Sequence, residues 1–477
     1  MATSETKAIE SFSALVDGSG GAIVQRPLLD VGIDSVATDS RSVTRGGLFV
    51  ALPGERTDGH EFLRQAAESG AAALLISDIQ ALRRGGELAA LSGTYGLGVV
   101  SVPDTLAALQ NLARVRICSL PSVTRIGVTG SNGKTTTKEI IGRLLACHAP
   151  TAINEGNFNS EIGLPIACFG VGPGHRYAVL EMGMNRSGEM EILADIVRPD
   201  LALITNVGSA HIGLLGSRDA IAAEKKRIFD HFDGRQTGFL PEGERYRGFL
   251  SEGVRGKMVT FGPGSTPGFE RSESMGLGGT LIHWEGFRIR FPLFGPHNLA
   301  NALGAVSVAR ELGVPNAEIR DGLEAVAPLF GRSQVIQGDV TVIADCYNAN
   351  PDSMERSLDF FESLSWGGRR IAVLGGMREL GVQTAPAHAE LGERLRATGL
   401  DLVFLVGAEM EHAWKSAQGG ASVSHISWGA SVDALGQLLH SLVRPGDIVL
   451  LKGSRGLELE RLLPRLAKRD STRGGRC

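Results

Sequence analysis

Short apolar runs, each followed by turn residues and an amphipathic stretch, recur along the whole chain. Residues 72–76, 179–182 and 201–205 are such runs, and their length suits buried β-strands better than helices. Strands that alternate with helices are typical of α/β domains built on mostly parallel sheets. With 477 residues, the chain is long enough for about three domains of ordinary size.

The strand and turn signals predict three units. We expect a small α/β domain over 1–118, a central domain with a mostly parallel sheet over 119–328, and a doubly wound, Rossmann-like domain over 329–477. In this third unit the predicted strands end at Asp345, Leu374, Val406 and Leu451, and the predicted helices lie near 352–363, 387–397, 431–442 and 456–467. Alternating patterns within 235–295 predict β-hairpins, and 468–477 is expected to be a frayed tail.

The segment 126–139, IGVTGSNGKTTTKE, combines an apolar strand, a glycine-rich turn and the start of a helix. Backbone N–H groups in such a turn form a concave site for phosphate oxygens, aided by the helix N-terminus. Lys134 would reach the β- and γ-phosphates of a nucleotide, and the Thr135 hydroxyl would hold Mg²⁺. In the usual phosphate-binding loop a glycine stands five residues before Gly133, and here that position is Val128. The alternative, a turn without a ligand, is disfavoured by the strand before it and the helix after it.

Two polar side chains stand at or just beyond the ends of predicted strands in the central unit. Glu181 is the carboxylate near the end of the run 179–182, and His211 follows the run 201–205. In an open α/β sheet, ligands bind at the carboxyl ends of the strands. We therefore expect Glu181 and His211 to face the same place as Lys134. The alternative for each is a loop residue solvated at the surface.

A helix predicted over 218–232 places a lysine among apolar side chains. Ile221, Lys225 and Phe229 are four residues apart and so share one face. One interpretation is that the stem of Lys225 covers the core while its ammonium reaches water. The other is that Lys225 is functional, because a buried lysine readily loses its proton and becomes open to modification.

Amides and charged groups mark two further places. Asn298 and Asn301 share a face of the helix that begins after Gly295, where paired amides suit either a purine edge or helix capping without a ligand. No Gly-x-Gly-x-x-Gly follows the first strand of the third unit, which disfavours a nicotinamide cofactor. The polar residues expected at the carboxyl edge of its sheet include Asp345, Tyr347, Asn348, Asn350 and Lys452.

Composition narrows the class of partner. A net charge of −4 gives no broad positive field, so nucleic acid is not expected as a partner. The five cysteines are an odd number without metal-binding spacing, which suits a reducing compartment. The N-terminus lacks a basic stretch before an apolar run, and no apolar run reaches about 18 residues. We expect a cytoplasmic protein that does not insert into membranes.

Six segments resemble, in order, signatures of the Mur ligase family of peptidoglycan synthesis. They are the glycine-rich loop within 126–139, called the P-loop below, and the segments 157–165, 180–183, 205–213, 224–229 and 295–302. In the third unit, 345–354 and 373–381 resemble the family member that joins D-alanyl-D-alanine to UDP-N-acetylmuramoyl-tripeptide. Residues 39–60 resemble the UDP-binding N-terminal domain. Positions that depart from the family pattern are Ser160, Ser333, Cys346 and Gly375.

The resemblance implies an ATP-dependent amide ligase of cell-wall biogenesis that works through an acyl phosphate. It assigns catalysis to Lys134, Lys225 and His211, and two Mg²⁺ ions to Thr135, Glu181, His211 and a carbamylated Lys225. It assigns ATP binding to Gly130, Ser131, Asn132, Gly133, Lys134, Thr135, Thr136, Asn298, Asn301, Arg332 and Asp345. It assigns substrate binding to Ser40, Arg41, Asn159, Tyr347, Asn348, Asn350 and Lys452.

The same resemblance implies a role for each unit. Residues 1–118 would bind the UDP-muramoyl-peptide, 119–328 would bind ATP, and 329–477 would bind the incoming dipeptide and part of ATP. We expect a monomer. Two alternatives stay open: a Mur-type ligase that adds a diamino acid or glutamate, and a nucleotide-switched binding protein that makes no amide.

Overall fold

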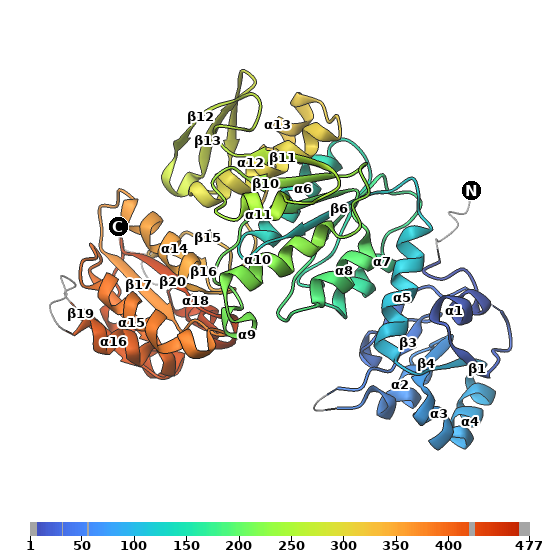
Figure 1. Ribbon diagram of the computed structural model, residues 1–477. Helices are drawn as coiled ribbons and strands as arrows, with labels where there is room; N and C mark the ends of the chain where they lie inside the picture. Colours follow the sequence, from blue (N-terminus) through green and yellow to red (C-terminus); the bar gives the residue numbers. More distant parts are fainter. Residues whose placement is uncertain (1–6, 31, 55–56, 419–424, 467–477) are drawn as a thin grey trace, which may run out of the picture.

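The computed structural model describes residues 7–30, 32–54, 57–418 and 425–466. They form an N-terminal lobe (residues 12–118), a central lobe (124–324) and a C-terminal lobe (334–466), with the central lobe between the other two (Figure 1). The tail expected over 468–477 lies outside the described residues. Among the described helices, none is long and apolar enough to cross a membrane.

The N-terminal lobe is built on a five-stranded sheet in the order β1-β5-β4-β3-β2. The strands are parallel except β1, which pairs with β5 in the antiparallel sense. The elements are α1 Phe12–Ser19, β1 Ala22–Gln25, β2 Val36–Ala37, β3 Leu48–Val50, α2 Leu63–Glu68, β4 Ala73–Ser77, α3 Asp78–Arg83, α4 Gly85–Tyr95, β5 Gly98–Val102 and α5 Thr105–Cys118.

The central lobe carries a six-stranded parallel sheet in the order β11-β10-β9-β6-β8-β7. Its elements are β6 Thr124–Thr129, α6 Lys134–Ala146, β7 Thr151–Ile153, α7 Gly163–Phe169, β8 Tyr177–Glu181, α8 Glu189–Val197, β9 Leu201–Ile204, α9 Ile212–Leu215, α10 Arg218–Lys226, β10 Thr237–Pro241, α11 Arg247–Ser251, β11 Lys257–Phe261, α12 Pro296–Glu311 and α13 Asn316–Glu324. A separate antiparallel sheet contains β12 Phe269–Ser274, β13 Thr280–Trp284 and β14 Phe287–Phe291.

Two predictions for this lobe are wrong in part. Hairpins form only at β12 to β14, whereas β10 and β11 are parallel strands of the main sheet. Strands that pair with partners distant in the sequence leave no local signal of that pairing. The alternating pattern alone could therefore not separate a hairpin from parallel strands of the main sheet. The helix expected over 218–232 ends at Lys226 and continues as a single 3₁₀ turn, Arg227–Phe229.

The C-terminal lobe has a six-stranded sheet in the order β15-β16-β20-β17-β18-β19. Its elements are β15 Gln334–Ile336, β16 Thr341–Asp345, α14 Pro351–Ser363, β17 Arg370–Gly375, α15 Thr384–Leu395, β18 Leu402–Val406, α16 Glu411–Ala417, β19 His425–Gly429, α17 Val432–Leu442, β20 Ile448–Lys452 and α18 Leu463–Leu466. Because β15 runs antiparallel to β16, the sheet is mixed and not purely parallel.

The three-domain α/β class is confirmed, with three corrections in this last lobe. The expected strand and helix repeats omitted α16 and β19, and the helix expected over 456–467 is a series of short 3₁₀ turns before α18. The predicted strands also omitted β15, because its three residues are too few to show a hydrophobic period.

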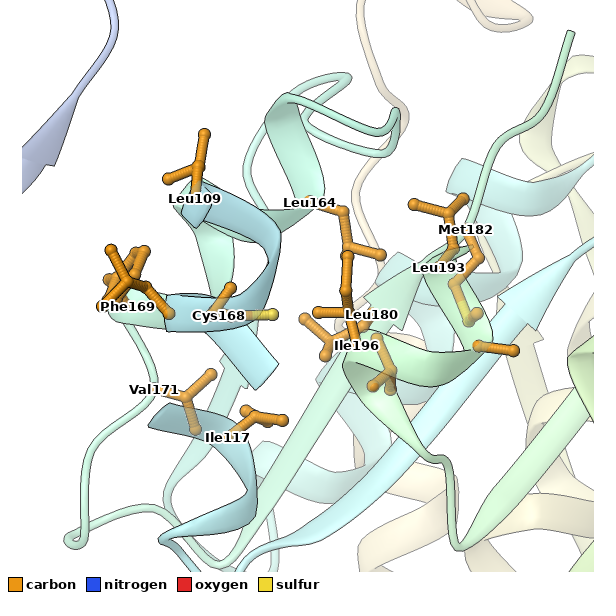
Figure 2. Close-up of a cluster of buried hydrophobic side chains, with 14 of the residues drawn as sticks. Leu109, Ile117, Leu164, Cys168, Phe169, Val171, Leu180, Met182, Leu193 and Ile196 are labelled. Atoms are coloured by element: carbon orange, nitrogen blue, oxygen red, sulfur yellow. The ribbon is translucent and has the colours of Figure 1, made fainter. Parts of the chain in front are cut away.

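Helix α5 connects the N-terminal lobe to the central lobe through a shared apolar core. Figure 2 shows Leu109 and Ile117 of α5 close to Cys168 of α7, with Leu180 of β8 and Ile196 of α8 beyond. All five side chains belong to one buried cluster. The N-terminal lobe is thus packed on the central lobe through this helix.

Candidate active site

The glycine-rich loop joins β6 to α6 as the sequence predicts. Gly130 and Gly133 have φ angles of 149° and 81°, which favour glycine. A Cβ at Gly130 would lie 1.8 Å from Thr205 Oγ1, so a side chain there would displace the loop. Lys134 Nζ donates to Gly130 O at 2.9 Å. The loop therefore folds back over the lysine that begins α6.

Asn206, two residues beyond the end of the neighbouring strand β9, holds this loop in place. Its backbone oxygen accepts from Ser131 N at 2.9 Å, and its Oδ1 accepts from Asn132 N at 3.0 Å. Its Nδ2 donates to Asn132 O at 2.9 Å. The conformation of the loop is thus set by β9 as well as by its own glycines.

A cavity of about 1020 Å³ opens beside the loop, between the central and C-terminal lobes. It is large enough for a nucleotide and part of a second substrate. The predicted site residues that line it are Ser131, Asn132, Gly133, Lys134, Thr135, Thr136, Asn159, Glu181, His211, Asn298, Asn301, Arg332, Asp345, Tyr347, Asn348 and Lys452. The expectation that Glu181 and His211 face the same place as Lys134 is confirmed.

Five predicted site residues are not in the cavity wall. Gly130 is part of the loop and Lys225 is part of α10, and both are buried outside the cavity wall. Asn350 caps α14 and donates to Asn132 Oδ1 at 2.7 Å, one side chain away from the cavity. Ser40 and Arg41 belong to the N-terminal lobe, where Ser40 Oγ donates to Gln65 and the exposed Arg41 pairs with Asp39.

The Glu181 carboxylate has one hydrogen-bonded oxygen and one oxygen without a hydrogen-bond partner among the described residues. Its Oε1 accepts from Asn159 Nδ2 at 2.6 Å. Its Oε2 is buried and has no hydrogen-bond partner among the described residues. A buried carboxylate oxygen without a partner is costly, and carboxylate and hydroxyl oxygens are the ligands that Mg²⁺ prefers. Glu181 and the Thr135 hydroxyl therefore fit a magnesium site.

His211 directly precedes α9 and has a positive φ of 63°. Its Nδ1 lies 2.7 Å from Glu379 Oε2 of the C-terminal lobe, although the direction of approach is not that of a well-formed hydrogen bond. The contact with His211, together with Lys134 nearby, holds the pKa of Glu379 below its usual range, against the effect of burial. A histidine of the cavity wall is thus in contact with both lobes.

Lys225 is 1% exposed, so its ammonium does not reach water as the first interpretation required. Burial, and then the charge of Lys134, lowers its pKa well below the usual value. A neutral amine is the form that can be carbamylated. Within the described ranges, no three His, Cys, Asp or Glu side chains are grouped as a metal site. The two-ion arrangement and the carbamylation of Lys225 stay predictions.

Asp345 is the best-anchored charged group of the C-terminal wall. Its Oδ2 lies 2.9 Å from Lys452 Nζ and accepts from Ser357 Oγ at 2.7 Å. Burial alone would raise the pKa of Asp345, but Lys452 and Ser357 outweigh it and lower the pKa. Nearby, the Arg332 guanidinium lies 4.1 Å from the centre of the Tyr347 ring. The wall thus offers fixed charge to a polar ligand.

Sequence reasoning missed several residues of the cavity wall. His297 lines it, and burial lowers the pKa of its imidazole to about 4. Its place beside Asn298 in the segment 295–302, which resembles a family signature, was a signal that could have identified it. Arg356 and Glu139 also line the cavity, but each stands in a helical pattern where a charged residue is ordinarily solvated.

Known families match along nearly the whole chain. Residues 32–116 match the Mur ligase family catalytic domain, 128–309 the Mur ligase middle domain, and 331–455 the glutamate ligase domain of Mur ligases. The UDP-N-acetylmuramoyl-tripeptide--D-alanyl-D-alanine ligase of Treponema pallidum (strain Nichols) is 41% identical, covering 92% of this chain and 94% of the relative. The chain belongs to the Mur ligase family. The ligase of the same description from Bacillus subtilis (strain 168) is 34% identical to this Mur ligase, covering 90% and 92%.

Solved structures agree with this assignment. The crystal structure of MurF from Acinetobacter baumannii matches this Mur ligase with a TM-score of 0.85 at 29% identity, covering 97% of this chain and 100% of that one. MurF ligase from Thermotoga maritima in complex with ADP gives a TM-score of 0.75 at 29% identity, covering 93% and 97%.

Two departures from the family pattern have a physical reading in this Mur ligase. Cys346 is 1% exposed, and burial raises the pKa of its thiol to about 11, so it packs as an uncharged side chain. A Cβ at Gly375 would lie 2.7 Å from Leu457 Cδ1. A longer side chain there requires Leu457 to move.

Proposed function

We propose that this Mur ligase joins D-alanyl-D-alanine to the free carboxylate of UDP-N-acetylmuramoyl-tripeptide, with conversion of ATP to ADP and phosphate. The observation that carries the proposal is the similarity to ligases of that description, 41% and 34% identical, over more than nine-tenths of their lengths. The cavity supports it, because the P-loop lines the same space as Asp345, Tyr347 and Asn348.

The reaction has to overcome the poor reactivity of a carboxylate as an acyl donor. In the proposed route, a carboxylate oxygen of the tripeptide attacks the γ-phosphorus of ATP, and ADP leaves. The dipeptide amine then attacks the acyl phosphate carbonyl, and the tetrahedral intermediate expels phosphate and leaves an amide. In phosphoryl transfer the protein mostly positions the reactants and neutralises charge.

Lys134 is the residue best placed to neutralise phosphate charge. Burial lowers the pKa of its ammonium, and Arg332 lowers it further, while Glu181 and Glu379 raise it. A bound triphosphate would add negative charge and favour the protonated lysine. Its bond to Gly130 O keeps the ammonium at the loop. We assign the β/γ-phosphates to Lys134, with Arg332 as a second phosphate contact.

The remaining roles follow the lining of the cavity. We assign the adenine side to Asn298 and Asn301, and the ribose to Asp345. The incoming dipeptide and the tripeptide end are assigned to Asn159, Tyr347, Asn348, Asn350 and Lys452. Mg²⁺, when bound, would offset phosphate charge. Its ligands would be Thr135 and Glu181 for one ion, and His211 and carbamylated Lys225 for a second.

The N-terminal lobe is proposed to hold the UDP end of the substrate through Ser40 and Arg41. The Arg41 side chain is 80% exposed and its guanidinium lies beside Asp39. Since neither residue lines the cavity, the lobes would close around the substrates before reaction. We further propose that residues 1–118, 119–328 and 329–477 divide the binding of the three substrates as the family resemblance implies, and that the protein acts as a cytoplasmic monomer.

The test is incubation with ATP, Mg²⁺, UDP-muramoyl-tripeptide and single candidate amines, with the product weighed by mass spectrometry. We expect the pentapeptide product with D-alanyl-D-alanine only, and none with Lys134→Ala. Phosphate release that does not depend on D-alanyl-D-alanine contradicts the proposal. A product with a diamino acid or glutamate supports the first alternative, and ATP-dependent partner binding without product supports the nucleotide switch.

A further inference from the structure

Helix α6 contains a buried lysine that the proposed reaction does not use. Lys138 is 0% exposed, and it does not line the cavity, whereas Thr135 and Glu139 of the same helix do. A buried ammonium is costly unless it is paired and hydrogen-bonded. The contacts of Lys138 therefore show what it supports.

Lys138 has two partners. Its Nζ donates to Asn154 O at 2.5 Å and lies 2.8 Å from Glu139 Oε1. Asn154 directly follows β7 and is itself 2% exposed. The lysine thus fixes the backbone at the point where β7 ends and the following loop begins.

The Asn154 side chain carries this support to the neighbouring strand. Its Oδ1 accepts from Glu181 N at 2.9 Å, and its Nδ2 donates to Glu181 O at 3.1 Å and to Phe158 O at 2.8 Å. The amide therefore extends the pairing of β7 with β8 by one step, and it does so at the residue whose carboxylate enters the cavity.

The same loop also holds the Glu181 side chain. Asn159 Nδ2 donates to Glu181 Oε1 at 2.6 Å, and Asn159 O accepts from Gly183 N at 2.8 Å. Glu181 is thus held at its backbone by Asn154 and at one carboxylate oxygen by Asn159. Only Oε2 is left without a partner among the described residues.

We propose that Lys138 is a positioning residue that, through Asn154, aims the free oxygen of Glu181 at the divalent cation bound with the nucleotide. The inference rests on the proposed use of ATP with Mg²⁺ by this site. Lys138 does not itself touch the nucleotide or the cation. It acts on the orientation of a ligand, as outer-shell groups do at other metal sites.

Binding of a non-hydrolysable ATP analogue, measured by calorimetry in EDTA and in saturating Mg²⁺, tests the proposal. Lys138→Met removes the donor and keeps the apolar stem. We expect the gain in affinity due to Mg²⁺ to fall by about tenfold, the lower end of what outer-shell partners of metal ligands contribute, while binding in EDTA is unchanged. Hydrogen exchange of the Glu181 amide in metal-free protein should become faster, because its acceptor is on Asn154.

Thr137→Val is the matched control, since Thr137 is also 0% exposed and its hydroxyl has no hydrogen-bond partner among the described residues. We expect wild-type behaviour from it. Lys138→Gln keeps a donor and should fall between wild type and Lys138→Met.

Three results would overturn the positioning role. They are an unchanged Mg²⁺ effect in Lys138→Met, an equal loss in Thr137→Val, and a failure of both Lys138 variants to fold or to bind the analogue in EDTA. Because binding is measured without ligation, a protein that makes no amide but shows the expected shift refutes the ligase proposal alone.

Discussion

The two lysines at the P-loop and on α10 differ in what they can do. Lys134 lines the cavity and keeps its ammonium beside a backbone carbonyl. Lys225 is closed off from water, and burial together with the charge of Lys134 lowers its pKa. The first is suited to hold phosphate, and the second is suited to react with CO₂ in its neutral form.

Lys225→Ala tests the chemical role of that lysine. If the carbamate is a metal ligand, activity should fall by at least about 100-fold, which exceeds the usual cost of losing an outer-shell partner. Acetate or another short carboxylate should restore part of it, and added CO₂ should raise the activity of wild type prepared without it. Steady-state rates of phosphate release measure both effects.

Lys226→Ala is the matched control for Lys225, because Lys226 Nζ lies 4.5 Å from the centre of the exposed Phe249 ring and not in the core. It should leave the rate unchanged. If neither carboxylate nor CO₂ changes the rate of the Lys225 variant or the wild type, Lys225 is a packing residue.

At this scale, motif residues were predictable and their neighbours were not. Lys134 and Thr135 follow from the strand, glycine turn and helix around them. Asn206 holds the P-loop, and Lys138 is proposed to position Glu181, through contacts between segments distant in the sequence. No local sequence pattern indicates such contacts. Lys225 was placed on an apolar face, but its full burial required the packed core.

Helix α14 is the element that joins the C-terminal lobe to the central one. Asn350 caps its first turn and bonds to Asn132 of the P-loop at 2.7 Å. Asp352, in the same turn, accepts from both Ser209 N and Ser209 Oγ at 2.6 Å, and its other oxygen accepts from Arg218 at 2.8 Å. The start of one helix therefore anchors both lobes around the cavity.

The carboxylate of Asp352 makes this contact dependent on pH. Burial alone would raise its pKa, but the bonds from Ser209 and the charge of Arg218 outweigh burial and lower the pKa. A carboxylate with a lowered pKa stabilises the folded state above the unfolded pKa, which is about 3.9 for aspartate, and this stability is lost as pH falls through the folded pKa.

Asp352→Asn should therefore lower the free energy of unfolding by about 2 kcal/mol at pH 7, a typical value for hydrogen bonds to a charged group. The difference in the free energy of unfolding between the variant and wild type should become smaller as the pH falls below about 4. Urea unfolding followed by tryptophan fluorescence measures it, because Trp366, Trp414 and Trp428 belong to the C-terminal lobe.

Asp359→Asn on the same helix is the control, since Asp359 is 63% exposed and forms a surface ion pair with Arg394. Surface pairs of this kind contribute little. A pH-independent loss in Asp352→Asn, or an equal loss in Asp359→Asn, would contradict the anchoring role of Asp352.

Elements with a strong local period were predictable, and those set by distant pairing were not. In α6, for example, Ile140, Ile141, Leu144 and Leu145 recur at helical spacing, and all four side chains are buried. In contrast, the antiparallel β15 and the parallel β10 and β11 could be assigned only once their partner strands were known.

In the whole molecule, the central and C-terminal lobes also meet where α9 packs against the segment after β17. Gly213 N donates to Glu379 O at 3.0 Å. A Cβ at Gly213 would lie 2.3 Å from Gly381 N, and a backbone atom cannot move aside as a side chain can. The glycine is what allows His211 and Glu379 to meet.

Gly213→Ala should hold the two lobes apart. A displacement of about 1 Å in a reacting pair can cost on the order of 100-fold in rate, so we expect a fall in turnover of that order while the protein stays folded. Kinetics together with small-angle scattering measure the two effects. Gly248→Ala, where a Cβ meets nothing within 4 Å, is the control, and a wild-type rate in Gly213→Ala would show that this contact does not govern the site.

The α/β class could be predicted from the alternation of strand and helix patterns, and the family from six family-like segments that occur in order along the chain. The cavity could be predicted only in part. The ends of the predicted strands indicated that Lys134 and Glu181 lie in one place, but the position of the C-terminal wall depends on how the lobes are arranged. The placement of Ser40 and Arg41 away from the cavity depends on that arrangement too.

The central claim is that the tripeptide carboxylate takes the terminal phosphoryl group of ATP. Tripeptide substrate with heavy oxygen in its free carboxylate tests this most directly. If an acyl phosphate forms and is opened by the dipeptide amine, one labelled oxygen appears in each phosphate released, as mass spectrometry would show. Amide formation with unlabelled phosphate would contradict the account.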